Sequence, residues 1–291
     1  MGMRIRTNVS SLTTQRYAAE NQQKMQSSME KLASGYRINK SADDAAGLAV
    51  SEAINAKTRG LNVGRRNAND AVSMIQTAEG AMNEMTNIVV RMRELTVQAA
   101  SDTIGDTERG YLNKEYVQLT NELDRIKNTA EFNGTFFFSE EANDEFVVQV
   151  GTNGSSPDEN VDTITIKLDG LKFDTEALGL GNESEIGPAE TGGSGPSRDE
   201  IAGKLGTLDN VLSRFASERA TLGAQQSRFQ SAINNLGISV ENLTTAKSRI
   251  KDTDFAAETA KLAQARILTQ ASTSTLSQAN ASSDIAVSLL R

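Results

Sequence analysis

Two absences limit the chemistry open to this chain of 291 residues, which contains no histidine and no cysteine. Without histidine it lacks the commonest general base and transition-metal ligand. Without cysteine it lacks disulfides, thiolate metal ligands and thiol nucleophiles. Carboxylate or lysine catalysis stays open, but neither a glycine-rich phosphate loop nor a zinc-ligand spacing occurs. We therefore predict a protein that is not an enzyme and that holds no cofactor or metal.

Two pairs of adjacent charged residues are the remaining candidates for a chemical site. Asp43 and Asp44 could hold a metal or act as an acid–base pair, but no third ligand type lies nearby. Ser41 followed by these acidic residues stands before the helix-forming residues 45–50, so we interpret the segment as a helix N-terminus that is capped and that complements the helix dipole. Arg65 and Arg66 could bind an anion, and we interpret them as part of a solvated or inter-subunit face.

Composition narrows the class of protein further. Aromatic residues make up only 4% of the chain and tryptophan is absent, which favours an elongated helical body over a compact globule. The net charge of −8 disfavours a nucleic-acid partner. No apolar run reaches the roughly 18–20 residues of a membrane span, and residues 1–10 lack the apolar core of a cleaved signal peptide. We expect no membrane insertion, and a chain without cysteine fits either a cytosolic protein or one exported by another route.

The prolines divide the chain into three parts. All three, Pro157, Pro188 and Pro196, lie in the middle, and proline disrupts helices. The long proline-free arms before and after them are therefore predicted to be helical.

Apolar residues spaced by threes and fours run along both arms, as in helices that pack along partner helices. The first run is Met74, Ala78, Ala81, Met85, Ile88, Met92, Leu95 and Ala99. The second is Leu112, Tyr116, Leu119, Leu123, Ile126 and Ala130. The third is Leu205, Leu208, Leu212, Phe215, Arg219, Leu222, Gln226, Phe229, Ile233, Leu236, Val240, Leu243, Lys247 and Ile250. An ordinary helical core would show the same spacing, but the length of the runs favours a rod, with a turn at residues 101–110.

The middle of the chain changes to a period of two. Phe146, Val148 and Val150 alternate on one face, and so do Ile164, Ile166 and Leu168, which predicts a β-hairpin. Residues 182–198 contain four glycines and two prolines, so they are predicted to be a flexible connection.

The two ends of the chain differ in character from the arms. Ile5, Val9, Leu12, Ala19, Met29 and Leu32 follow a helical spacing. Residues 267–283 contain no charge, and eight of these 17 residues are Ser or Thr. Such a helix suits close helix–helix contact in which hydroxyls bond within their own turn, and a frayed terminus is the alternative. We infer that neighbouring molecules bury or order these ends.

Long motifs in both arms resemble those of the bacterial flagellins. They are residues 32–52 (LASGYRINKSADDAAGLAVSE), residues 59–85, residues 91–103, the EFNG motif at 131–134, and residues 254–291, which include ARILTQASTSTLSQAN. The likeness covers both arms and does not extend clearly into the middle.

This resemblance implies a mainly α protein whose arms form an elongated coiled-coil or bundle rod, with a small β-hairpin region in the middle. It implies a structural subunit that polymerises with itself into the extracellular flagellar filament. Such subunits are exported unfolded through the flagellar export apparatus, without a cleaved signal peptide, and assemble at the tip. Further implied partners are an export chaperone at the C-terminal helix, the cap and the hook-junction proteins.

The resemblance also divides the chain into segments. Residues 1–42 would form the N-terminal inner-core helix and connector, and residues 252–291 the C-terminal inner-core helix. Residues 43–135 and 201–251 would form the two parts of the rod domain, and residues 136–200 the hairpin and flexible connection. The apolar residues expected to drive self-assembly are Ile5, Val9, Leu12, Leu32, Ile267, Leu268, Leu276, Ile285, Leu289 and Leu290.

A second surface follows from the resemblance alone. In similar flagellins the residues matching Arg91, Leu95 and Glu115 are contacted by the vertebrate Toll-like receptor 5, although Val90 and Met92 depart from some strongly recognised relatives. The other interpretation is that these residues serve the inter-subunit face. Two other identities stay open, a hook–filament junction protein of the same family and a cytosolic coiled-coil scaffold.

Overall fold

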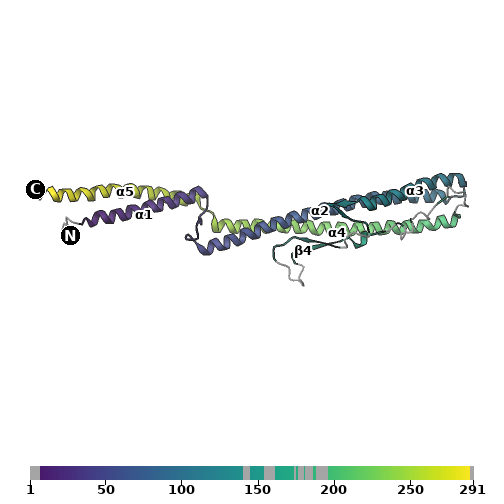
Figure 1. The fold of residues 1–291 in the computed structure, drawn as a ribbon, viewed down its shortest axis with the longest axis horizontal. Coiled ribbons are helices and arrows are strands. Elements are labelled where there is room, and N and C mark those ends of the chain that lie inside the picture. Colours follow the sequence, from purple (N-terminus) through teal and green to yellow (C-terminus); the bar gives the residue numbers. More distant parts are fainter. Residues whose placement is uncertain are drawn as a thin grey trace. The chain divides into compact units, whose positions relative to one another are not determined.

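A computed structural model describes residues 7–139, 145–153, 161–173, 175, 180, 186–187 and 196–288. These residues form five α-helices and two antiparallel strand pairs, which confirms the mainly α fold (Figure 1). The chain divides into two compact units. Residues 1–58 and 241–291 form the terminal unit, and residues 59–240 form the central unit.

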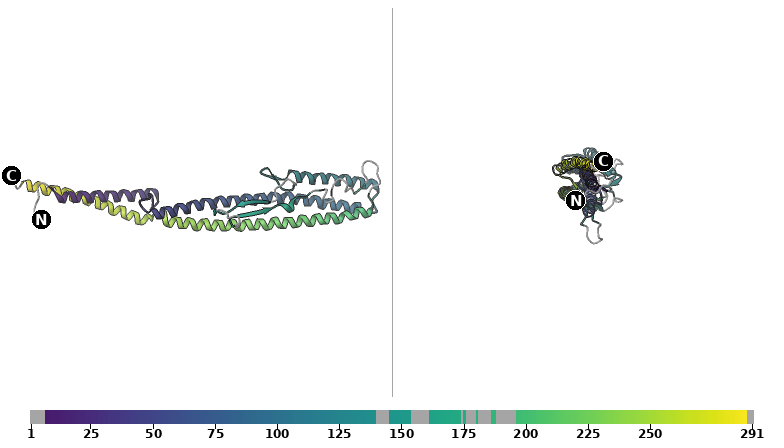
Figure 2. Two further views of the ribbon diagram at one scale, coloured as in Figure 1. Left: turned by 60° about the horizontal axis from the view of Figure 1, so that its bottom comes forward. Right: turned by 90° about the vertical axis from the view of Figure 1, so that its left-hand side faces the viewer.

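The terminal unit is built on two antiparallel helices, α1 (Val9–Ser34) and α5 (Phe255–Ser288), which lie side by side (Figures 1 and 2). The side chain of Asn8 caps the start of α1 by accepting a hydrogen bond from the Ser11 amide. Gly35 ends α1 at a φ of 74°, a left-handed conformation that glycine adopts without steric cost. Asp254 caps the start of α5, accepting hydrogen bonds from two backbone amides of its first turn.

The central unit contains most of α2 (Ala45–Ala99) and α4 (Arg198–Lys251) and the whole of α3 (Asp106–Thr129). The turn from α2 to α3 falls at residues 100–105, which overlaps the predicted range of 101–110. Every member of the three predicted runs is buried or half-buried, which confirms that the residues at this 3–4 spacing face the core. The helix α2 buries a wider face than expected, because Ile75, Met82 and Val89 beside the predicted run are also buried.

Two hairpins follow α3. The strands β1 (Glu131–Phe132) and β2 (Thr135–Phe136) pair around a two-residue turn in which Asn133 and Gly134 have φ angles of 51° and 78°. This hairpin was not predicted. The predicted hairpin is confirmed as β3 (Glu145–Gln149) and β4 (Thr163–Lys167), with Phe146 opposite Ile166.

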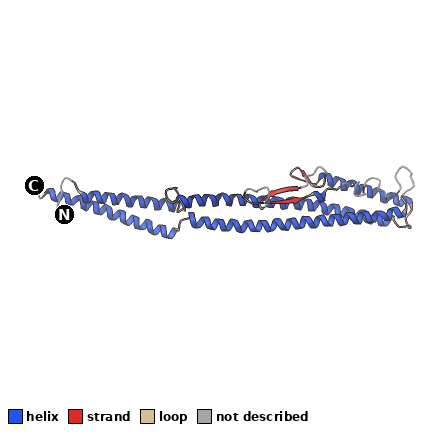
Figure 3. Cartoon of the chain, turned by 90° about the horizontal axis from the view of Figure 1, so that it is seen from below, coloured by secondary structure: helices blue, strands red, loops and turns tan. Residues whose placement is uncertain are grey.

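The larger hairpin lies against the helices of the central unit (Figure 3). The side-chain Nδ2 of Asn67 on α2 donates a hydrogen bond to the Gln149 carbonyl (3.0 Å). The backbone at Gly64 approaches the Val150 carbonyl so closely that any side chain at this position would collide with it. After β4, a short 3₁₀ turn (Asp169–Leu171) leads to Phe173, whose ring lies 5.4 Å from that of Phe215 on α4. Packing with the rod helices therefore holds this hairpin.

Some predictions lie wholly or mainly outside the described residues. These are the positions of Pro157 and Pro188 and most of the connection at 182–198. The predicted segment boundaries at 42/43 and 251/252 stay predictions. They fall in the connectors beside α1 and α5, whereas the compact units divide at 58/59 and 240/241.

Candidate self-assembly surface

The stripe of α1 that faces α5 is half polar. Its buried and half-buried members are Ser11, Thr14, Ala18, Asn21, Met25, Ser28 and Leu32. The facing stripe of α5 also repeats every seven residues and consists of Glu258, Leu262, Ala265, Thr269, Ser272, Leu276 and Ala279. The sequence had indicated a different, apolar set of residues for the N-terminal end. Among the described residues of that set, only Leu32 belongs to this contact.

Hydrogen bonds join the two helices along this stripe. Near the chain ends, Asn8 Nδ2 donates to the Ala279 carbonyl (2.9 Å) and Ser11 Oγ donates to Asn280 Oδ1 (2.8 Å). In the middle, Asn21 Nδ2 donates to Ser272 Oγ (3.1 Å). Toward the end of α1, Ser28 Oγ donates to Glu258 Oε1 (2.7 Å). Polar pairing therefore extends over most of the length of α1.

Other apolar side chains of the two helices are exposed outside the contact stripe. Val9 and Leu12 are 58% and 57% exposed on α1, and Ile267 and Leu268 are 68% and 41% exposed on α5. Val9 and Ile267 each stand two residues, or about 200°, from a buried member of the contact stripe, which places them on the opposite face. A shallow hollow on the outer face of α5 is lined by Arg266, Ile267, Gln270, Ala271 and Ser274.

The hydroxyls of α5 bond to their own helix, as the sequence predicted. Thr269 and Ser272 on the contact stripe, and Thr275 on the exposed surface, each donate to the carbonyl four residues earlier, at 2.7 to 2.8 Å. The exposed hydroxyls of Thr273 and Ser277 donate to the carbonyls of Gln270 (2.8 Å) and Thr273 (3.2 Å). Because its proton is already bonded, such a hydroxyl leaves no donor without a partner when it enters an interface. The outer face of α5 thus combines exposed apolar side chains with hydroxyls that already have a partner.

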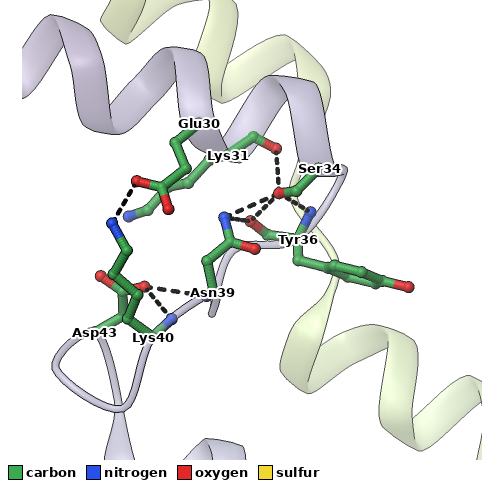
Figure 4. Close-up of polar contacts among 7 residues, drawn as sticks. All are labelled: Glu30, Lys31, Ser34, Tyr36, Asn39, Lys40 and Asp43. Atoms are coloured by element: carbon green, nitrogen blue, oxygen red, sulfur yellow. Dashed lines mark hydrogen bonds and ion pairs between the residues drawn. The ribbon is translucent and has the colours of Figure 1, made fainter.

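The chain leaves α1 through a polar connector (Figure 4). The Asp43 carboxylate accepts hydrogen bonds from the backbone amides of Asn39 and Lys40, both at 3.0 Å, and these bonds lower its pKa, that of Lys40 most. Lys40 Nζ lies 2.8 Å from Glu30 Oε2, and this contact raises the lysine pKa. Asp44 Oδ1 accepts a hydrogen bond from the Gly47 amide and caps α2 (2.8 Å). The two aspartates therefore have structural roles, which confirms the predicted helix N-terminus.

The two connectors of the terminal unit are joined by backbone hydrogen bonds. The Arg37 amide donates to the Lys251 carbonyl (2.7 Å), and the Thr253 amide donates to the Gly35 carbonyl (2.9 Å). Lys251 Nζ also binds Glu52 Oε1 at 2.8 Å. These contacts tie the start of α2 and the end of α4 to the terminal unit and explain why its boundary lies inside both helices.

The other predicted assembly residues fall into two groups. Leu32 and Leu276 are half-buried in the contact between α1 and α5. Ile285 lies in α5, but its side chain is outside the described residues, as are Ile5, Leu289 and Leu290 altogether. The charged pair Arg65 and Arg66 is exposed on α2, as predicted for a solvated face.

The three candidate receptor residues do not share one environment. Arg91 Nη2 lies 2.8 Å from Glu115 Oε1, and Arg91 Nη1 lies 2.9 Å from Glu94 Oε2. These carboxylates, Glu94 first, raise the pKa of Arg91. Leu95 belongs to the core and is 1% exposed. Arg91 and Glu115 are therefore the members of the set that reach the surface.

The polar half of the contact stripe is the feature that sequence reasoning missed. The search for apolar residues at helical spacing selected Val9 and Leu12, which lie on the outer face. A signal was present, because Ser11, Ala18, Met25 and Leu32 also repeat every seven residues.

Among the described residues, no helix has the length and apolar content needed to cross a membrane.

Two family models match the chain and together cover more than half of it. One, described as the bacterial flagellin N-terminal helical region, matches residues 5–143. The other, described as the bacterial flagellin C-terminal helical region, matches residues 205–290.

Individual relatives agree with these matches. A flagellin of Halalkalibacterium halodurans is 38% identical over 289 residues, which cover 99% of this chain and 100% of the relative. Flagellin D of Vibrio cholerae is 35% identical over 376 aligned positions, covering all of both chains. A solved structure from Vibrio parahaemolyticus, described as a flagellar hook-associated protein, is 12% identical with a TM-score of 0.57. It matches 72% of this chain and 100% of its own, and this likeness concerns the fold alone.

Proposed function

This chain belongs to the bacterial flagellin family, whose members are structural subunits of the flagellar filament, and we propose that it polymerises through the outer faces of α1 and α5. As a filament subunit, the chain is extracellular and associates with copies of itself. The manner of assembly that follows is our proposal.

The observation that carries this proposal is the position of the apolar side chains in the terminal unit. Val9, Leu12 and Ile267 are more than half exposed, whereas the contact between the two helices is half polar. Burial of apolar surface is the main favourable term in most protein association, so these faces gain most from a neighbouring copy. The absence of charge from residues 267–283 removes a desolvation cost that a charged helix would meet.

The symmetry of the contact decides the form of the assembly. A surface on one copy that binds a different surface on the next gives an open helical filament when the rotation does not close. Contact of the outer face of α1 with the outer face of a neighbouring α5 would be of this heterologous kind. If the ends order only on assembly, their lost conformational entropy becomes part of the polymerisation equilibrium.

Truncation tests the proposal directly. Full-length chain, a variant lacking residues 1–35 and a variant lacking residues 252–291 would be compared by sedimentation and electron microscopy after dissociation in acid and neutralisation. Full-length chain should regrow filaments. Both truncated chains should stay soluble and helical, because the central unit has its own core. Long filaments from either truncated chain would show that the terminal helices do not drive assembly.

The hook–filament junction protein is the second candidate. It would share the terminal helices, and the hook-associated structure has a similar fold. A junction protein would be present in few copies, so the abundance of this chain in sheared filaments separates the two. The relatives named flagellin, which match over their full length, favour the filament subunit over both the junction protein and a cytosolic scaffold.

Export and assembly partners complete the proposal. We infer that the chain passes unfolded through the flagellar export apparatus, and that it assembles beneath the cap, near the hook-junction proteins. The outer face of α5, with Ile267 and Leu268 exposed, would suit an export chaperone. Neither a catalytic role nor a cofactor is part of this function.

Recognition by Toll-like receptor 5 is a separate proposal. The exposed ion pair of Arg91 with Glu115 could supply a charged contact, and Leu95 would contribute by positioning α2 from the core. Binding of the monomeric chain to the purified receptor ectodomain tests it. Substitution of Arg91 by Ala should weaken binding, and an unchanged affinity would argue against this surface.

A further inference from the structure

We propose that the buried hydrogen bond between Ser28 and Glu258 sets the register in which the two terminal helices pair. This contact would act as a specificity-determining pair in the terminal unit, distinct from the outer faces that bind neighbouring copies. The inference rests on the proposed function only in that the paired helices belong to the polymerising part of the chain.

Ser28 and Glu258 differ from the other polar pairs in burial and in charge. Their exposed fractions are 6% and 7%, and their oxygens lie 2.7 Å apart. Lys261 Nζ, on the same helix one turn later, lies 3.0 Å from the other carboxylate oxygen. Burial alone would raise the pKa of Glu258, but the hydrogen bonds from Ser28 and Lys261, with the charges of Lys261 and Lys31, bring it below its usual value. In this arrangement both oxygens of the carboxylate have a partner, and the partner that the other helix supplies is Ser28.

The apolar part of the contact cannot select a register by itself. Its members, such as Ala18, Met25 and Leu262, are small or flexible and recur at heptad spacing, so a slip of one heptad exchanges apolar neighbours for apolar neighbours. A buried polar group in such a stripe discriminates between registers, because the wrong register leaves it without a partner.

Either slip by one heptad separates the pair. In one direction Ser28 moves opposite Ala265 and Glu258 moves opposite Gly35, so neither side chain meets a side-chain hydrogen-bond partner on the other helix. In the other direction Ser28 moves opposite Lys251, ahead of the first residue of α5. Glu258 would then meet Asn21, but the last ten residues of α1 would extend past the start of α5. Each slip therefore loses either the buried hydrogen bond or a large part of the contact.

Because the natural chain contains no cysteine, a disulfide between two introduced cysteines can report the register of the helices. Asn21→Cys with Ser272→Cys reports the observed register, because these side chains are in contact at 3.1 Å. Asn21→Cys with Ala279→Cys reports the first slip. Each cysteine pair would be introduced into three backgrounds and oxidised in both the pellet and the supernatant of an assembly reaction. The yield of the intrachain disulfide would be measured on non-reducing gels.

The three backgrounds are the natural sequence, Ser28→Ala/Glu258→Leu, and the matched control Ser27→Ala/Thr259→Ala, which alters the adjacent exposed positions. In the natural sequence and the control, the Asn21–Ser272 pair should dominate. Ser28→Ala/Glu258→Leu should raise the yield of the slipped pair about tenfold, the order expected for one charged hydrogen bond. Glu258→Gln, which keeps an acceptor for Ser28, should retain the observed register.

Two results would overturn the inference. The first is an unchanged yield of the slipped pair in Ser28→Ala/Glu258→Leu while circular dichroism shows the helices intact. The second is disulfide-linked dimers from the Asn21–Ser272 pair, which would place the contact between copies. Failure of the proposed function is distinguishable, because it appears as absence of any pellet from the natural sequence while the intrachain product still forms.

Discussion

Truncation of Ile267 to alanine should weaken assembly and leave the monomer intact. Ile267 is 68% exposed on the face of α5 opposite the contact with α1, so it makes little contribution to the folded monomer. Substitutions at such exposed positions usually change the free energy of unfolding by no more than about 0.5 kcal/mol. Thermal unfolding of Ile267→Ala should therefore match that of the natural chain.

The effect on assembly follows from the area that a neighbour can still cover. Ile→Ala removes three carbon atoms, worth about 0.8 kcal/mol each when fully buried. Because 68% of the side chain remains to be covered, the loss per subunit contact is about 1.6 kcal/mol. A free-energy difference of this size corresponds to roughly a fifteenfold change in an equilibrium constant. The critical concentration for filament growth should rise by about that factor.

The assay is the concentration of chain left in the supernatant after seeded growth reaches a plateau. Ile238→Ala is the matched control, since Ile238 is the same residue type, is 61% exposed and lies on α4 in the central unit. The control should change the critical concentration less than about twofold. The reasoning is refuted if Ile267→Ala leaves the critical concentration unchanged, or if Ile238→Ala raises it by the same factor.

Three further predictions concern packing and pH. Gly64→Ala places a methyl group against the Val150 carbonyl and should lower the free energy of unfolding by about 1–3 kcal/mol in thermal melts. Gly80→Ala, with open space around it, should be neutral or stabilising. Tyr116 is 2% exposed with its hydroxyl unpartnered, and burial raises its pKa to about 12, so Tyr116→Phe should preserve the melting temperature or raise it, and a drop of several degrees would contradict this. The folded pKa of Glu258 lies below its ordinary value of 4.5, so its contribution to stability is present above pH 4.5 and is lost as the pH falls through the folded value. Helical content followed by circular dichroism from about pH 5 to 3 should fall less steeply in Glu258→Gln than in the natural chain.

The long helices of the central unit were predictable because their partners lie in the same chain. In α4 the predicted run includes polar members such as Arg219, Gln226 and Lys247, and all of them are half-buried as the spacing required. Arg219 Nη2 lies 3.9 Å from Glu79 Oε1 of α2, so a charged side chain can occupy the run with its charged end paired. Spacing predicted these positions better than residue type did.

The hairpin β1–β2 shows the opposite case. It has only two residues in each strand, too few for alternation to be visible. Its evidence in the sequence was the dipeptide Asn133–Gly134, which favours a two-residue turn with positive φ at both positions. This dipeptide lies inside the EFNG motif at 131–134, so residues that carry the family resemblance also form the turn.

In the terminal unit the sequence predicted residues for association between copies but not the contact between the two helices. Apolar spacing at the N-terminal end selected Val9 and Leu12 as residues that contact neighbouring copies, and this stays a prediction with which their exposure agrees. Ser28 and Asn21 face α5 together with Met25 and Leu32, in a half-polar contact that apolar spacing alone does not indicate. A sequence does not show which of two faces meets the same chain and which meets another copy.

This half-polar contact has an energetic consequence for an isolated terminal unit. Such a pair of helices gains less from burial than a wholly apolar pair would, because each hydrogen bond replaces one to water and contributes only about 0.5–1.5 kcal/mol. Exposed Val9, Leu12 and Ile267 leave apolar area uncovered until a neighbour arrives. The polar contact can therefore select a register without stabilising the pair strongly, and the outer faces can supply the larger share of the free energy once copies associate. A terminal unit of this kind gains most of its stability in the polymer, which links the order of its helices to the concentration of subunits.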